Sequence, residues 1–307
     1  MCRVLAYLGE PVLLDHLLFA ADNSLIRQTY APRMSAMLNL AGFGLVAWDE
    51  TSHEPTMPFG YRTTAVPVFD RNLKQLAHKL HPHALIAHVR GVPYTTRVTV
   101  SDANLHPFLY DGTRLAFAHN GQLERFDEMR FDLVEHIRPE WGRQIRGNTD
   151  SEWLYAVFLS QLEDAAAELT TDRLARAAEA TFRIVRTVRA RLGIATYSPV
   201  NLFVSDGDRV AAIRFAFDFG CYPPDGGPIS DAMLNFMSLW YTCGKTYGLH
   251  DGAWTMVGGP TASSSIIVSS EPLSADRATW LEVPEYSMLV ATRLGDGVRR
   301  DEVEIDA

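Results

Sequence analysis

The spacing of apolar residues changes along the chain, and the first third mixes short apolar runs with longer periodic stretches. Runs at residues 2–8, 45–48 and 84–89 predict strands, and each is followed by a glycine or a charged residue. Residues 13–30 and 70–80 carry apolar positions three or four apart, which predicts helices.

The middle of the chain is helical in pattern, and the last third is rich in strands. Residues 115–118 predict a strand, and residues 151–162 and 174–192 predict helices. Short β-rich runs separated by Gly, Pro or Asp follow at residues 201–204, 210–215, 238–243, 265–269 and 287–292. Strands, then helices, then strands indicate an α+β sandwich rather than a parallel sheet of βαβ units.

No linker or internal repeat divides the 307 residues. We therefore expect one domain over residues 2–294, although the length alone also permits two. Residues 295–307 form a polar C-terminal tail, which we expect to fray.

Composition narrows the class of protein. The chain is 47% hydrophobic and 21% charged, which suits a folded core and argues against disorder. A net charge of −9 argues against a nucleic-acid partner. Three widely spaced cysteines (Cys2, Cys221 and Cys243) indicate a reducing compartment without a disulfide framework. The histidines are scattered and have no metal-binding spacing, so we expect no metal site.

The apolar stretch 4–21 raises the question of a targeting or membrane segment. Glu10 and Asp15 interrupt it, and no small-residue cleavage site follows, so we expect neither a signal peptide nor a membrane span. We expect a cytoplasmic protein without a membrane partner.

Cys2 is the most informative single position. Removal of Met1, which we expect because the Cys2 side chain is small, leaves a thiol and a free α-amine on one residue. An α-amine with a pKa of about 7.7–8.0 accepts a proton near neutral pH, where a lysine does not. A terminal cysteine can therefore be a nucleophile that supplies its own general base, although cysteine also occurs at position two by chance. If Met1 persists, the base lies on the wrong residue and we expect no activity.

Two further segments carry groups that suit catalysis, and each also has an ordinary structural interpretation. Arg90 ends an apolar run and can bind a carboxylate through two parallel hydrogen bonds, or can simply face solvent. Asn120-Gly121 is a strong hairpin signal, but the Asn120 side-chain amide and the Gly121 backbone N–H can also form an oxyanion hole.

The segment 149–152 predicts a helix start. Thr149 and Glu152 have the spacing of a capping box, and Asp150 in the first turn suits the helix dipole. Alternatively, Asp150 contacts a substrate ammonium group. His106, in the loop 104–108, is a competing candidate for general base or a locally hydrogen-bonded loop residue.

Together these groups suit one kind of substrate. A cation, a carboxylate and an oxyanion hole around a terminal thiol fit a molecule with an α-carboxylate, an α-ammonium and a reactive side-chain carbonyl. Glutamine and γ-glutamyl compounds have that combination.

The ordered motifs resemble those of the class II glutamine amidotransferases, which are N-terminal-nucleophile hydrolases. The start of the chain is similar to the stand-alone branch that includes a γ-glutamyl hydrolase of ergothioneine synthesis. The resemblance covers residues 2–293 and rests on residues 2–9, His88-Val-Arg90, Asn104-Leu-His-Pro-Phe108, His119-Asn-Gly121, Thr149-Asp-Ser-Glu152, residues 201–207 and residues 269–273.

The resemblance implies a four-layer αββα sandwich of two antiparallel sheets and a role for each matching residue. Cys2 is the implied nucleophile with its α-amine as base, and Asn120 and Gly121 form the oxyanion hole. Arg90 holds the substrate α-carboxylate and Asp150 the α-ammonium. The implied reaction passes through a γ-glutamyl thioester to glutamate, with ammonia or an amine as leaving group and no metal or organic cofactor.

Two positions depart from the family pattern. Pro93 follows the arginine motif and lacks a backbone N–H, and Thr95 or Thr96 is a possible replacement donor. Ala41 stands where the family typically has Asp.

The sequence leaves three functions open. The chain is an ammonia-supplying subunit for a separate synthase or acceptor protein, a stand-alone hydrolase of a γ-glutamyl conjugate, or a non-catalytic amino-acid-binding regulatory protein with the same fold.

Overall fold

The first apolar run of the sequence is a central strand of the larger of two sheets. The computed structural model describes residues 2–35, 37–92, 100–222, 236–259, 263–295 and 297–306. In it, β1 (Arg3–Leu8) is buried along its whole length and pairs antiparallel with β11 and β4. The seven-stranded sheet has the order β12-β8-β11-β1-β4-β2-β3. Its other strands are β2 (Phe43–Trp48), β3 (Phe59–Thr63), β4 (Ala84–Val89), β8 (Trp240–Gly244), β11 (Ser265–Ser269) and β12 (Leu281–Glu282).

The second sheet is also antiparallel and packs against the first. Its five strands have the order β14-β13-β7-β6-β5. They are β5 (Ala116–Gly121), β6 (Ser198–Ser205), β7 (Arg209–Phe217), β13 (Ser287–Leu294) and β14 (Gly297–Glu304).

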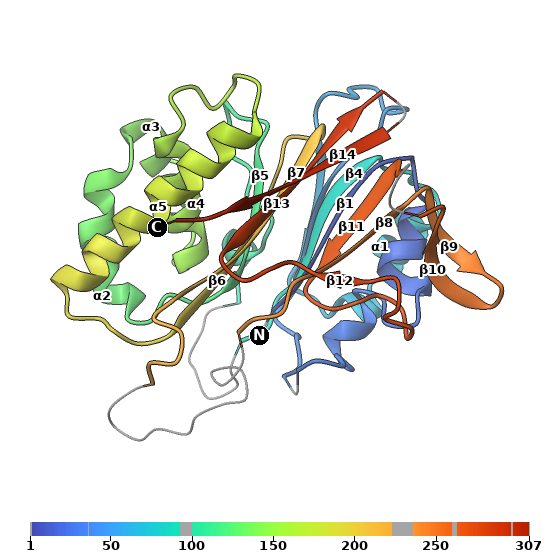
Figure 1. Cartoon of the computed structure of the whole chain (residues 1–307), viewed down its shortest axis with the longest axis horizontal. Helices are drawn as coiled ribbons and strands as arrows, with labels where there is room; N and C mark the ends of the chain where they lie inside the picture. The colour runs from blue at the N-terminus through green and yellow to red at the C-terminus, as the bar shows by residue number, and fades with distance from the viewer. Residues whose placement is uncertain are drawn as a thin grey trace.

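Helices cover the outer faces of both sheets (Figure 1). The five-stranded sheet is covered by α2 (Phe126–Leu133), α3 (Pro139–Gly142), α4 (Asp150–Gln161) and α5 (Thr171–Arg191). The cover of the seven-stranded sheet is lighter, with α1 (Arg71–Ala77), a π-helical turn (His16–Ala20) and the hairpin of β9 (Thr246–His250) and β10 (Ala253–Val257). Short 3-10 turns lie at Arg27–Thr29, Pro67–Phe69, Asp102–Asn104 and Val134–His136. The expected four-layer αββα sandwich is confirmed.

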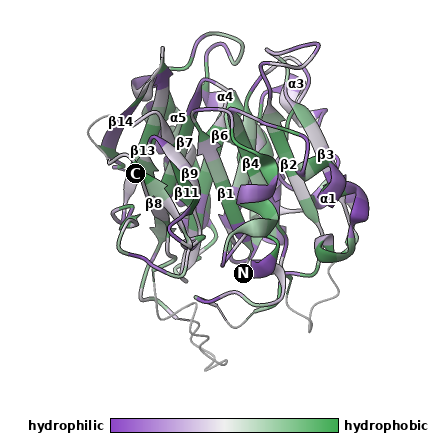
Figure 2. Cartoon of the chain, turned by 90° about the vertical axis from the view of Figure 1, so that its right-hand side faces the viewer, coloured by the Kyte–Doolittle hydropathy of each residue, from purple (hydrophilic) through white to green (hydrophobic). Residues whose placement is uncertain are grey.

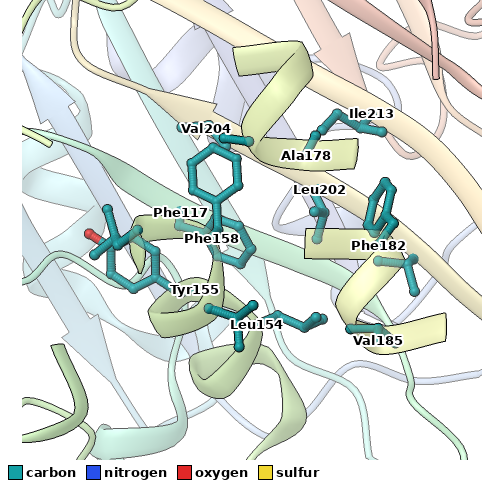
Figure 3. Packing of buried hydrophobic residues seen from close by; sticks show 14 of the residues in the cluster. Phe117, Leu154, Tyr155, Phe158, Ala178, Phe182, Val185, Leu202, Val204 and Ile213 are labelled. Atoms are coloured by element: carbon teal, nitrogen blue, oxygen red, sulfur yellow. The ribbon is translucent and has the colours of Figure 1, made fainter. Parts of the chain in front are cut away.

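Three apolar layers hold these elements together. Between the two sheets the buried side chains are mostly small or of medium size, among them Ala6, Ala84, Ala118 and Ala212, which lets the sheets approach closely. Between the five-stranded sheet and its helices, aromatic rings such as Phe158 and Phe182 are fully buried (Figure 3). The third layer lies between the seven-stranded sheet and its lighter cover. Figure 2 shows the strands of that sheet as mainly hydrophobic behind the more hydrophilic α1.

The helix expected over residues 13–30 is wrong. Its apolar residues do face the core, but the chain turns at residues 21–24. There the backbone N–H of Asn23 donates to Leu273 O (2.8 Å), and its side chain donates to Pro272 O (2.7 Å). An asparagine side chain that bonds backbone elsewhere competes with the helix, so the periodic stretch divides into short turns.

The expectation that the chain frays beyond residue 294 is also wrong. β14 pairs with β13 over eight residue pairs, and Ile305 after it is buried. The strand is polar because it is the exposed edge of the sheet, where charged side chains discourage pairing with another chain. Polar composition here marks an edge strand rather than a loose tail.

The other predicted elements are present, with small shifts at their ends. Asp70 caps α1, because its carboxylate accepts from the backbone N–H of Asn72 and Leu73 (both 3.0 Å). The sequence did not predict β3, the β9–β10 hairpin, α2 or α3, which are short and partly exposed.

Candidate active site

The start of β1 and the end of β4 meet at the same end of the seven-stranded sheet. Arg3 pairs with Val89 in the antiparallel register, so Cys2 and Arg90 occupy the next positions outward. Side chains alternate along a strand, and Val4, Ala6 and Ile86 face the second sheet. The same alternation directs Cys2 and Arg90 toward that sheet.

The Cys2 thiol lies against the peptide that follows Arg90. The Gly91 backbone N–H donates to Cys2 Sγ at 3.3 Å, and Sγ lies 3.5 Å from Gly91 O. A Cβ at position 91 would approach Asn39 Oδ1 to 2.3 Å and Met37 Cε to 2.7 Å. A larger residue at position 91 would therefore displace those two side chains, while the Gly91 N–H gives the thiol a backbone donor suited to a thiolate.

Arg90 is a buried cation beside the thiol. Its side chain is 6% exposed, and its Nη1 has no hydrogen-bond partner among the described residues. Burial lowers the pKa of Arg90, while Cys2 and Asp150 lie close enough to oppose that effect. A buried guanidinium with an unused donor is suited to bind a carboxylate.

Asn120 and Gly121 are the last residues of β5, not a turn. They pair with Asn201 and Val200 of β6, so the hairpin interpretation is wrong. The fully buried Asn120 side chain donates from Nδ2 to Ser270 Oγ at 3.0 Å. Because Ser270 Oγ also accepts from the N–H of Val4 (3.0 Å), this bond links the end of β5 to the start of β1.

Gly121 also needs to be glycine. A Cβ there would lie 2.0 Å from Pro199 O and 2.4 Å from His119 Nε2. The backbone of the proposed oxyanion hole therefore packs directly on its neighbours without a side chain in between.

Asp150 starts α4 beside the loop that follows β5. Its carboxylate accepts from the Leu123 N–H (2.7 Å) and from Ser151 Oγ (3.1 Å). A carboxylate has about four acceptor positions, so two bonds leave room for a cation.

The capping-box interpretation of this segment is wrong. Thr149 is the N-cap residue, but its side chain makes no capping bond. Glu152 instead accepts from the backbone N–H groups of Arg146 (3.0 Å) and Gly147 (2.6 Å). Its carboxylate therefore bonds the loop before the helix and does not take part in a cap.

His106 belongs to a buried histidine cluster. His88, His106 and His119 are each at most 4% exposed, and His106 Nδ1 lies 2.9 Å from His88 Nε2. His119 Nδ1 lies 2.9 Å from Ser151 Oγ. Burial lowers the pKa of all three, that of His88 to about 3. The His106 ring packs against His88 and Phe108.

Only one of the two positions that depart from the family pattern lies among the described residues. Ala41 lies beside the arginine, because its N–H donates to Arg90 O (2.9 Å). Pro93, Thr95 and Thr96 lie outside the described residues, as does Met1.

The sequence did not single out two serines that contact the candidate site residues. Ser270 contacts Asn120, and Ser151 contacts both Asp150 and His119. Their only sequence signal was membership of the segments 269–273 and 149–152. No residue pattern by itself indicated which serines turn toward the site.

The described residues contain no group of three or more His, Cys, Asp or Glu residues arranged to hold a metal ion. They also contain no helix with the length and apolar character needed to cross a membrane.

A family described as "Glutamine amidotransferases class-II" matches residues 42–216. That range includes Arg90, Asn120, Gly121 and Asp150, whereas Cys2 lies outside it.

Curated relatives agree with this match. "Probable glutamine amidotransferase DUG3" of Saccharomyces cerevisiae is 29% identical over 94% of this chain and 81% of its own length. "Gamma-glutamyl-hercynylcysteine sulfoxide hydrolase" of Mycobacterium tuberculosis is 31% identical over 41% of this chain and 51% of its own length.

Solved structures support the fold. A glutamine aminotransferase class-II domain protein from Silicibacter pomeroyi has a TM-score of 0.58 at 22% identity, covering 99% of this chain and all of the other. Glutamine phosphoribosylpyrophosphate amidotransferase from Bacillus subtilis has a TM-score of 0.52 at 14% identity. The match covers 99% of this chain and 50% of the Bacillus chain.

Proposed function

The chain belongs to the class II glutamine amidotransferases, and we propose that it hydrolyses a γ-glutamyl amide through a thioester on Cys2. One observation carries the proposal. The buried Arg90 has an unused guanidinium nitrogen, and it lies close to both the Cys2 thiol and the Asp150 carboxylate.

The substrate is anchored by its amino-acid end. Arg90 pairs with the α-carboxylate and Asp150 with the α-ammonium. These two contacts fix the side-chain carbonyl carbon next to Cys2 Sγ, and such positioning lowers the entropic part of the barrier.

The first half of the reaction transfers the acyl group. The Cys2 α-amine, free once Met1 is removed, takes the thiol proton, and the thiolate forms a bond to the carbonyl carbon. The charge that develops on the carbonyl oxygen is stabilised by the Asn120 side-chain amide and the Gly121 backbone N–H. The protonated α-amine then gives its proton to the leaving nitrogen as the C–N bond breaks.

The second half releases glutamate. Water attacks the thioester carbon with the α-amine as base, the C–S bond breaks, and the thiol takes back its proton. No other reactant is needed.

The relatives support two forms of this reaction. The name of the yeast relative supports glutamine as the substrate, with ammonia passed to a separate synthase or acceptor protein. The name of the mycobacterial relative supports a γ-glutamyl conjugate that releases an amine. Glutamine turnover stimulated by a partner protein supports the first form, and conjugate cleavage with negligible glutamine turnover supports the second. In either form we propose a cytoplasmic location.

Replacement of the nucleophile tests the mechanism. We expect Cys2→Ala to lower glutamate release from glutamine and from γ-glutamyl-p-nitroanilide by at least about a thousand-fold, because the covalent intermediate cannot form. The thermal unfolding midpoint stays the same, since Cys2 is only partly buried. Cys221→Ala, at an exposed cysteine, is the matched control and keeps full activity.

A glutamine-analogue electrophile separates the enzyme from a binding protein. Mass spectrometry after treatment should locate the label on Cys2 of a chain that lacks Met1. Turnover that survives in Cys2→Ala contradicts the mechanism, and the absence of labelling with intact ligand binding supports a non-catalytic protein.

A further inference from the structure

Ser270 lies where the strand of the proposed nucleophile meets the strand of the proposed oxyanion group. It follows β11 directly and is 2% exposed. Its backbone N–H donates to Val4 O at 3.0 Å, which continues the pairing of β11 with β1. Its hydroxyl oxygen accepts from the N–H of Val4 and from Asn120 Nδ2, both at 3.0 Å.

The hydroxyl takes the place of a backbone acceptor. In an antiparallel ladder, paired residues exchange two N–H···O=C bonds. Here the Val4 N–H bonds to the Ser270 side chain, and the Ser270 carbonyl accepts from Ser238 Oγ instead (2.9 Å). The backbone therefore leaves the ladder at this residue, and its hydroxyl is placed between the two sheets.

The next residue links the same segment to Cys2 through the side chain of Arg3. Glu271 is fully buried, and its Oε1 lies 3.5 Å from Arg3 Nε. Arg3 Nη1 in turn donates to the Cys2 carbonyl oxygen at 2.9 Å. Ser270 thus contacts Val4 on one side and Asn120 on the other, and Glu271 reaches the Cys2 carbonyl through the Arg3 side chain.

We propose that Ser270 is a positioning residue that holds the Asn120 amide toward the oxyanion formed at Cys2. The inference rests on the proposed function. An amide nitrogen carries two hydrogens, so the bond to Ser270 fixes the plane of the Asn120 amide and leaves the second N–H for the oxyanion. Without the hydroxyl, that donor is no longer held in place before the reaction, and preorganised donors are the ones that stabilise developing charge.

The kinetic signature separates this role from a structural one. We expect Ser270→Ala to lower kcat for γ-glutamyl-p-nitroanilide about 10–100-fold and to change KM less than about 2-fold, because Arg90 and Asp150 still hold the substrate. Alkylation of Cys2 by iodoacetamide, which forms no oxyanion, keeps its rate.

Ser265→Ala is the matched control. Ser265 is a fully buried serine at the start of β11, the strand that Ser270 follows, and its hydroxyl bonds Tyr7 OH (3.0 Å) and the Glu10 N–H (3.2 Å), at the other end of β1. We expect this variant to lose stability but to keep kcat once folded.

A double-mutant cycle gives the second measurement. If Ser270 acts through Asn120, Ser270→Ala has no further effect on kcat in an Asn120→Ala background. Should the alanine variant not fold, Ser270→Thr and Ser270→Val have similar shapes and differ in the hydroxyl, and only the threonine variant should retain kcat.

Two results overturn the inference. One is a fall in kcat no larger than that of Ser265→Ala, and the other is effects of Ser270→Ala and Asn120→Ala that multiply. Either result with an inactive Cys2→Ala leaves the proposed function intact, whereas an active Cys2→Ala refutes the proposed function itself.

Discussion

At the scale of single residues, the arrangement around Arg90 is the most specific feature of the site. A guanidinium that is 6% exposed and has an unpartnered Nη1 among the described residues is costly to bury unless a ligand completes it. Arg90 also lies close to the Cys2 thiol and the Asp150 carboxylate, which suits a ligand with a carboxylate.

Arg90→Lys tests the carboxylate contact. Lysine keeps the charge but loses the paired donors, so we expect kcat/KM for glutamine to fall roughly 10–100-fold. Cys2 alkylation by iodoacetamide, which carries no carboxylate, should change little. Arg114→Lys, at the opposite end of β5, is the control, and equal losses in the two variants would contradict a specific role for Arg90.

At the scale of elements, β4, β5 and the segment before β5 each place a histidine in one buried cluster. His88, His106 and His119 are buried, and burial lowers their pKa below that of an unfolded chain. For His88, the nearby Arg90 lowers the pKa further. The folded protein therefore keeps these rings neutral in conditions where the unfolded chain protonates them.

This difference predicts a loss of stability in mild acid. Below about pH 6.5 the unfolded state binds more protons than the folded state, so the free energy of unfolding falls by roughly 1 kcal/mol per pH unit for each buried histidine. Urea unfolding at pH 7.5, 6.5 and 5.5 should show this slope. It should become shallower in His119→Asn and stay unchanged in His53→Asn, at an exposed histidine. A slope that does not respond to His119→Asn would exclude the cluster as its source.

At the scale of the whole molecule, the two ends of the chain have different surroundings. Cys2 precedes β1 where Arg90, Gly91 and Ser270 converge, whereas the chain after β14 leaves from the edge of the other sheet. Since β14 is part of that sheet, we propose that the domain continues past residue 294.

An unprocessed extension ahead of Cys2 should therefore abolish turnover. Any residue joined to Cys2 converts the proposed base into an amide, which cannot accept a proton near neutral pH. We expect glutaminase activity to be lost while the unfolding midpoint stays the same, and the same extension after residue 307 to be harmless. Full activity with an intact N-terminal extension, checked by intact mass, would rule out the α-amine as base.

Local sequence patterns were sufficient to predict the strands that are buried on both faces. The apolar runs that became β1, β2 and β4 need only to be buried on both faces, and that requirement is visible in composition. The Asn120-Gly121 hairpin and the Thr149–Glu152 capping box failed because in each case the residue bonds partners outside the local pattern. Asn120 pairs with Asn201, and Glu152 bonds backbone groups of the preceding loop.

The sequence by itself determined which residues carry reactive groups, the alternation of strands and helices, and the family to which their order belongs. Folding decided which of those groups meet, because only the antiparallel register of β1 with β4 brings Cys2 beside Arg90. Folding also places the Ser270 hydroxyl where it accepts hydrogen bonds from residues 4 and 120, which lie in different sheets. Hydrogen bonds and buried charges depend on distances between segments far apart in the chain, and no local pattern encodes those distances.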